Sequence, residues 1–157
     1  MNTFFEIALA LFYGWWFLTQ LRVYDYTGAQ SYGVTSLGAG LNLLFFAVRD
    51  AWEFAGLLKV LGLILFSGGI ATTITFGSKL EIARLRTSSW KELFLGSVPA
   101  SLRKGGPNKR DSGLLVSFFL IFSAIILFLA DKSVTAIYLA VFGVVLGVYS
   151  VRPSRGN

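Results

Sequence analysis

The chain has 157 residues, of which 55% are hydrophobic and only 14% are charged. Soluble domains carry about 25% charged residues, and the long apolar blocks of this chain indicate lipid as the surrounding solvent. Because the chain has no Cys and no His, it lacks disulfides, cysteine-ligated clusters, His-ligated haem, the usual zinc sites and His-assisted nucleophiles. We therefore expect no cofactor and no enzyme acting alone, although membership of a larger enzyme complex stays open.

The net charge of +6 is unevenly distributed, since eight of the 14 Lys and Arg residues fall between Lys79 and Arg110. A basic stretch of this kind can bind nucleic acid, but it also marks the cytoplasmic loop of a polytopic membrane protein. Beside long apolar segments the second interpretation is favoured. The expected partner is the lipid bilayer, with no nucleic acid.

Five apolar segments predict an all-α polytopic membrane protein with about five transmembrane helices: residues 3–21, 32–48, 54–76, 113–130 and 134–151. A spanning helix needs about 20 predominantly apolar residues. The first segment has no basic residues before it and no clear cleavage site, so we expect it to be a retained span and not a signal peptide.

The second segment is rich in small and polar residues, among them Gly38, Gly40 and Asn42. Small residues allow close approach of neighbouring helices. A broken or re-entrant segment that lines a cavity is the alternative, because irregular backbone at membrane depth must be shielded from lipid. In the fifth segment, Gly143 and Gly147 form a GxxxG pattern and predict a helix-contact face, within the chain or toward a partner.

The distribution of charge also predicts the orientation. Residues 77–112 hold eight basic residues against three acidic ones, and Arg152 and Arg155 follow the last span. The positive-inside rule places both stretches in the cytoplasm, which leaves the N-terminus outside. We expect a multi-pass protein of the cell inner (cytoplasmic) membrane.

Within residues 77–112, Ser89-Trp-Lys-Glu92 matches a capping box and predicts a short helix with Trp90 and Val98 on one face. We expect this helix at the membrane interface, either as a lipid-facing anchor or as a dock for a soluble subunit. Residues 102–113 predict a flexible basic turn.

Two ionisable residues, Glu6 and Lys59, lie within the apolar segments. A charge at the centre of a span costs about 2.5 to 3.5 kcal/mol on insertion scales. Lys59 could lift its ammonium to the outer interface. Alternatively, Glu6 and Lys59 pair with each other or with a partner chain in an ion path, and Asn42 adds a ligand oxygen of the kind that hard cations such as Na⁺ prefer.

The stretch LRVYDYTGAQSYGVTSLGAGLNLL resembles the small G-type component of the multi-subunit Mrp-type sodium/proton antiporters. In that family a first span ends in a Leu-Arg-x-x-Asp turn, and a Leu-Gly-x-Gly-Leu span follows. The corresponding residues here are Leu21, Arg22, Asp25, Tyr26, Leu37, Gly38, Gly40 and Leu41. GLLKVLGLILF is similar to the third span of the family, with Lys59 at its lysine. The resemblance covers residues 3–86; Tyr24 replaces the usual Pro, and the loop His is missing.

This resemblance implies a three-helix G-like module over residues 1–86, followed by the basic cytoplasmic loop 87–112 and an additional hairpin 113–157. It implies a small subunit that contributes scaffold and a Na⁺/H⁺ path beside large antiporter-like subunits, or the equivalent subunit of a membrane-bound hydrogenase or sulfane reductase. The candidate path residues are Glu6, Asp25, Asn42 and Lys59. The alternatives are a structural accessory subunit of another energy-converting complex and a small channel that self-assembles through the last span.

Overall fold

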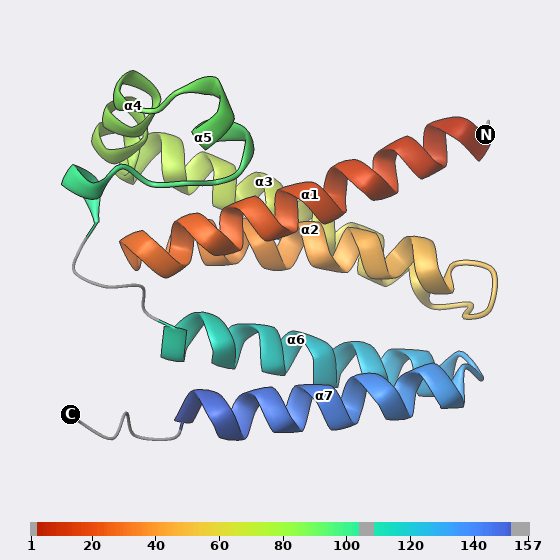
Figure 1. The fold of residues 1–157 in the computed structure, drawn as a ribbon. Helices are drawn as coiled ribbons and strands as arrows, with labels where there is room; N and C mark the ends of the chain where they lie inside the picture. The colour runs from red at the N-terminus through yellow and green to blue at the C-terminus, as the bar shows by residue number, and fades with distance from the viewer. Residues whose placement is uncertain (1–2, 104–108, 152–157) are drawn as a thin grey trace. The chain divides into compact units, whose positions relative to one another are not determined.

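The computed structural model describes residues 3–103 and 109–151, and all regular structure within them is helical (Figure 1). The long helices are α1 (Thr3–Thr27), α2 (Gln30–Val48), α3 (Ala55–Phe76), α6 (Lys109–Leu129) and α7 (Ser133–Val151); the short ones are α4 (Ser78–Thr87), α5 (Trp90–Phe94) and the 3₁₀ turn η1 (Ala100–Leu102). All five long helices are apolar and long enough to cross a membrane. The predicted all-α class with five helices of spanning length is confirmed.

The chain divides into two compact units, Met1–Pro107 and Asn108–Asn157. The first contains α1 to α5 and η1, and the second is the α6–α7 hairpin. Arg152 and Arg155, on which part of the predicted orientation depends, lie outside the described residues. The basic turn predicted over residues 102–113 is shorter than expected at its C-terminal end, because α6 begins at Lys109. Residues 104–108 of this turn lie outside the described residues.

α2 is the central helix of the first unit and packs against both α1 and α3. It is one uninterrupted helix, and 61% of its most apolar window is buried, against 6% for α1 and 17% for α3. α2 is therefore a tightly packed helix of spanning length, as expected, and the broken-segment alternative is wrong. The small residues of α2 serve close packing, as small residues do between transmembrane helices.

Three glycines bring α2 and α3 together. A Cβ added at Gly38 would lie 2.7 Å from the Cα atom of Phe66, and one at Gly69 would lie 2.7 Å from the backbone nitrogen of Thr35. A Cβ at Gly62 would lie 2.6 Å from the Asn42 side chain. Because two of these neighbours are backbone atoms that a side-chain rotation cannot move, glycine sets the distance between the two helices.

The turn between α1 and α2 lies later in the chain than the sequence suggested. Arg22–Asp25 was expected to form the turn, but α1 continues to Thr27 and the chain reverses at Gly28, whose φ is +66°. The Gly28 amide donates to the Tyr24 carbonyl at 2.8 Å, as in a glycine C-cap. The extra helical turn buries Val23 in a cluster with Tyr32 and Val98.

In the second unit, the GxxxG stripe of α7 packs against α6. A Cβ at Gly143 would lie 3.2 Å from the Ser117 carbonyl oxygen, and one at Gly147 would lie 2.6 Å from the Ser117 hydroxyl. That hydroxyl donates to the Gly143 carbonyl at 2.7 Å. The contact is thus within the chain, one of the two possibilities that the pattern left open.

The predicted helix after Ser89 is present and has its capping box, because the Ser89 side chain accepts from the Glu92 amide and the Glu92 carboxylate accepts from the Ser89 amide. It is shorter than expected and ends at Phe94, before Gly96 with its φ of +66°. Val98 therefore does not share a face with Trp90: Val98 is 1% exposed and Trp90 88%.

The last residue of α5 and the C-cap residue after it are held on α1 by hydrogen bonds and ring stacking. Trp15 Nε1 donates to the Phe94 carbonyl at 2.8 Å, and the two rings stack at 5.1 Å. Arg22 donates to the Leu95 carbonyl at 3.3 Å. α4 was not predicted at all; it covers the end of the α2–α3 pair where the chain leaves α3.

Candidate functional site

The first polar site is a cavity of about 120 Å³ between α1, α2 and α3, which we call the Lys59 pocket. Its lining is mostly aromatic and aliphatic, with three polar side chains besides the tyrosine, and comprises Leu9, Tyr13, Asn42, Phe45, Phe46, Arg49, Lys59 and Leu63. Two of the four predicted ion-path residues, Asn42 and Lys59, thus line one pocket.

Glu6 joins this site through Arg49. The Arg49 guanidinium lies 2.7 Å from the Glu6 carboxylate and 3.5 Å from that of Asp50. The predicted Glu6–Lys59 pair is therefore wrong. Glu6 contacts Arg49 instead because α1 and α2 pair antiparallel. Both residues lie almost equally far along the chain from the reversal at Gly28, so the sequence did contain a signal for their contact.

Lys59 is exposed, and its ammonium lies 5.6 Å from the centroid of the Phe45 ring. Such a cation–π contact contributes about 0.5 to 1 kcal/mol at an exposed position. Among the described residues, no carboxylate forms a salt bridge with Lys59. Its charge is therefore uncompensated within residues 3–103 and 109–151.

The other two candidates differ in their surroundings. Asn42 is buried, and its side-chain amide donates to the Gly38 carbonyl at 2.9 Å. Asp25 lies near the C-terminal end of α1, whereas Glu6 lies in its first turn. The structure therefore brings Asn42, Lys59 and, through Arg49, Glu6 together, but leaves Asp25 at the opposite end of the bundle.

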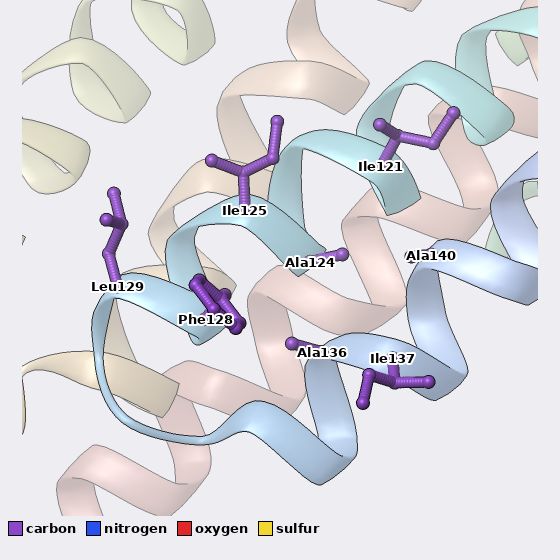
Figure 2. A pocket seen from close by; sticks show the side chains of 8 residues that line it. All are labelled: Ile121, Ala124, Ile125, Phe128, Leu129, Ala136, Ile137 and Ala140. Carbon is purple, nitrogen blue, oxygen red and sulfur yellow. The ribbon is translucent and has the colours of Figure 1, made fainter.

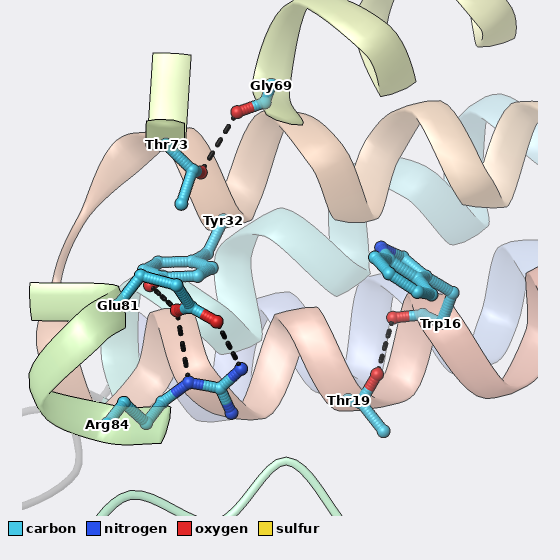
Figure 3. A network of polar contacts seen from close by, with 7 residues as sticks. All are labelled: Trp16, Thr19, Tyr32, Gly69, Thr73, Glu81 and Arg84. Carbon is cyan, nitrogen blue, oxygen red and sulfur yellow. Dashed lines mark hydrogen bonds and ion pairs between the residues drawn. The ribbon is translucent and has the colours of Figure 1, made fainter. Parts of the chain in front are cut away.

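The second polar site was missed by the sequence reasoning. Tyr32 donates to a Glu81 carboxylate oxygen, and Arg84 donates to both oxygens of the same carboxylate, from Nε at 3.1 Å and from Nη2 at 2.8 Å (Figure 3). These residues border a cavity of about 240 Å³, the Arg84 pocket, which is lined by Trp16, Gln20, Tyr32, Thr35, Ile70, Thr73, Ile74, Glu81 and Arg84.

Arg84 is only 7% exposed, although it stands on a short polar helix. Its Nη1 atom is buried and has no hydrogen-bond partner in the described structure, and the same holds for Trp16 Nε1. Burial alone raises the pKa of the Glu81 carboxyl, but the hydrogen bonds from Arg84 and Tyr32 outweigh this effect and hold the pKa below its usual value.

The lowered pKa of Glu81 predicts how the stability of the chain depends on pH. A carboxyl whose pKa is depressed on folding contributes stability above its unfolded pKa of about 4.5 and loses it as the pH falls through the folded value. We expect the native chain to be more stable than Glu81→Gln at pH 7, and we expect this difference in stability to shrink progressively below pH 4.5. Thermal unfolding of both purified chains in detergent, from pH 7 to pH 3, measures this difference; a constant difference would contradict it.

A third pocket, in the second unit, is wholly apolar. It measures about 270 Å³ and lies between α6 and α7, with the isoleucine, leucine and phenylalanine side chains of α6 on one side and the start of α7 on the other (Figure 2). Its lining comprises Ile121, Ala124, Ile125, Phe128, Leu129, Ala136, Ile137 and Ala140. Because none of these side chains is polar, the pocket can hold hydrocarbon but cannot bind or orient an ion, and the two polar sites remain the functional candidates.

Within residues 3–103 and 109–151 no cluster of acidic residues is suited to hold a metal ion. The Lys59 pocket presents an ammonium, an ion pair and an amide, which can stabilise or transfer charge but do not form a cation cage. A scan against family models, a search of curated proteins and a search of solved structures each found no match. The residues and their geometry therefore carry the functional conclusion.

Proposed function

We propose that this chain is a non-enzymatic, multi-pass subunit of a multi-subunit cation/proton antiporter, or of a related energy-converting membrane complex. In that role it serves as a scaffold and borders a Na⁺/H⁺ translocation path. The observation that supports it most directly is the Lys59 pocket, where α1, α2 and α3 place an uncompensated ammonium beside Asn42 and the Glu6–Arg49 pair.

The charge balance of the pocket defines the part that this chain takes. Glu6 and Arg49 neutralise each other, and the exposed Asp50 carboxylate contacts Arg49 from outside the pocket lining, so the ammonium of Lys59 has no carboxylate opposite it in that lining. Because the pocket lining contains an ammonium and no carboxylate, we infer that Na⁺ is bound by other subunits. Lys59 instead pairs with a carboxylate of a neighbouring large subunit, because an opposite charge lowers the cost of a cation at membrane depth.

The surface around Lys59 suits such a neighbour. Leu63, four residues after Lys59 on the same face of α3, is 42% exposed, whereas the more exposed Leu57, Val60, Leu61 and Ile64 lie on the opposite face. A transmembrane helix that carries a single carboxylate can contact both Lys59 and Leu63, and the leucine then helps to exclude water around the pair. Snorkelling of Lys59 to the outer interface is the competing account, and it requires no partner.

The orientation follows from the charges: the N-terminus lies outside the inner membrane, and α4, α5 and η1 lie on the cytoplasmic side. Trp90 and Phe94 of α5 are 88% and 62% exposed. Exposed aromatic rings beside basic residues favour an interfacial position for this segment, where it anchors in the headgroup region.

The substitution Lys59→Met tests this function in the intact complex. We expect sodium-dependent proton transport by the complex, reconstituted in liposomes, to fall at least roughly tenfold, as expected when about 1.4 kcal/mol of charge stabilisation is lost. The chain itself should still fold, because the Phe45 contact that Lys59 makes within the chain is weak, and a native gel checks that the complex assembles. Lys79→Met, an exposed lysine outside the spans, is the matched control and should transport normally.

A purely structural accessory subunit is the second candidate, and the glycine contacts between α2 and α3 favour it. It predicts unchanged transport in Lys59→Met and in the Glu6→Gln, Lys59→Met double variant, and that result would replace the first proposal. A self-assembling channel is less favoured, because the GxxxG stripe is already covered by α6. Ion flux from the purified chain alone would restore it.

A further inference from the structure

The Arg84 pocket contains two buried hydrogen-bond donors without partners. Arg84 Nη1 and Trp16 Nε1 have no acceptor in the described structure, and both residues line the same cavity. Figure 3 shows the Trp16 indole on one side and the Tyr32, Glu81 and Arg84 side chains on the other. Buried donors without partners are rare in folded proteins, since each costs the desolvation of its N–H groups. The pocket is therefore incomplete without a ligand.

The chemistry of the two donors limits the ligand. Both are donors only, so the ligand must present acceptor oxygens. Guanidinium groups bind phosphate and carboxylate oxygens with paired hydrogen bonds, and an indole N–H adds one further donor. Glu81 already neutralises the charge of Arg84, so the pocket lining has no net charge, and a monoanion such as a phosphodiester is favoured over a dianion.

The position and size of the pocket agree with a headgroup. Its α3 residues, Ile70, Thr73 and Ile74, lie in the last two turns before α3 ends at Phe76. A volume of about 240 Å³ is small for a whole ligand, since pockets for drug-sized molecules measure about 300 to 1,000 Å³. It accommodates a phosphate with the first carbons on either side, and the two isoleucines provide an apolar wall for those carbons.

We propose that the Arg84 pocket binds a phosphate group through Arg84 Nη1 and Trp16 Nε1, supplied by a phospholipid headgroup or by free phosphate. This site is separate from the Lys59 pocket, and the proposal does not depend on the function proposed for the Lys59 pocket. Occupancy would couple α1, through Trp16, to α4, through Arg84, and so fix the cytoplasmic end of the helix bundle.

The test follows the Trp16 indole directly. The full chain is labelled with ¹⁵N-tryptophan and purified in a maltoside detergent and phosphate-free buffer, and Trp16→Phe identifies its indole signal among the four tryptophans. Dihexanoyl phosphatidylglycerol, dihexanoylglycerol and sodium phosphate are then titrated separately. We expect phosphatidylglycerol to shift the Trp16 N–H signal and dihexanoylglycerol, which lacks the phosphate, to leave it unchanged.

Two variants test the donors. Arg84→Gln should weaken phosphatidylglycerol binding at least roughly tenfold, because one charged hydrogen bond is lost. Arg86→Gln, an exposed arginine on the same helix, is the matched control and should bind normally. Should Arg84→Gln fail to fold, Trp16→Phe keeps the aromatic ring and removes only the donor; native mass spectrometry should show its lipid binding to be weakened by a similar factor.

The outcomes are distinct. A shift of the Trp16 N–H signal with phosphatidylglycerol alone supports the proposal and identifies a lipid as the source of the phosphate group. A shift of this signal with sodium phosphate supports the proposal with free phosphate as the source. An unchanged Trp16 signal with both phosphate compounds overturns it. Equal shifts with phosphatidylglycerol and dihexanoylglycerol, or normal lipid binding by a folded Arg84→Gln or Trp16→Phe chain, also overturn it.

Discussion

Gly69→Ala is expected to destabilise the first unit strongly, whereas Gly68→Ala, one residue earlier on the same helix, is expected to be neutral or stabilising. A Cβ at Gly69 would contact the Thr35 hydroxyl and lie 2.7 Å from the Thr35 backbone nitrogen; a Cβ at Gly68 meets nothing within 4 Å. Overfilling a packed contact costs about 1 to 3 kcal/mol, and backbone neighbours place Gly69→Ala near the upper end.

The neighbouring glycine makes this comparison unusually direct. Both substitutions gain the same helix propensity, about 1 kcal/mol for Gly to Ala, so the difference between them reports the collision alone. The measurement is unfolding of the purified chains in detergent, by temperature or by SDS titration. Equal stabilities would show that α2 and α3 do not meet at Gly69. Removing the Thr35 hydroxyl in addition should not rescue the variant, because the backbone contact remains.

The number of long apolar helices could be predicted from the sequence, because the length of each apolar run is sufficient to identify a helix of spanning length. The residue at which α1 ends could not be predicted in this way. Arg22 and Asp25 are the kind of charged residues that close a span, yet the helix continues because Val23 is buried against Tyr32 and Val98. Contacts with residues far along the chain decide where such a helix ends, and a local pattern does not contain them.

The partners of charged residues show the same limit. Because Glu6 and Lys59 are ionisable residues within apolar segments, the sequence favours a pair between them, whereas the register of α1 against α2 selects Arg49 as the partner of Glu6. Arg84 was counted only as one of the basic residues that orient the chain. Its burial depends on α4 folding back over Tyr32, which neither composition nor charge indicates. The spacing of Glu81 and Arg84 by three residues was the one local signal for their pair.

The Glu81–Arg84 pair should dominate the stability of the end of the first unit where α4 packs against Tyr32. Arg84→Met removes both hydrogen bonds to Glu81 and leaves its half-buried carboxylate with Tyr32 alone. Removing one partner of a buried ion pair costs about 3 to 5 kcal/mol. Because the Glu81 side chain remains 25% exposed, we expect a loss near the lower limit, about 3 kcal/mol.

The double variant Arg84→Met, Glu81→Leu distinguishes the loss of an attractive pair from the isolation of a charge. Two apolar groups in place of a buried pair are often nearly neutral, so the double variant should recover most of the stability that Arg84→Met loses. Arg86→Met, on the exposed face of α4, should change stability by less than about 0.5 kcal/mol. Unfolding of the native chain and these variants, with Glu81→Leu alone, completes the cycle. If the double variant were as unstable as Arg84→Met, the isolated carboxylate would not be the cause, and the packing of the arginine stem against Tyr32 and its neighbours would have to account for the loss.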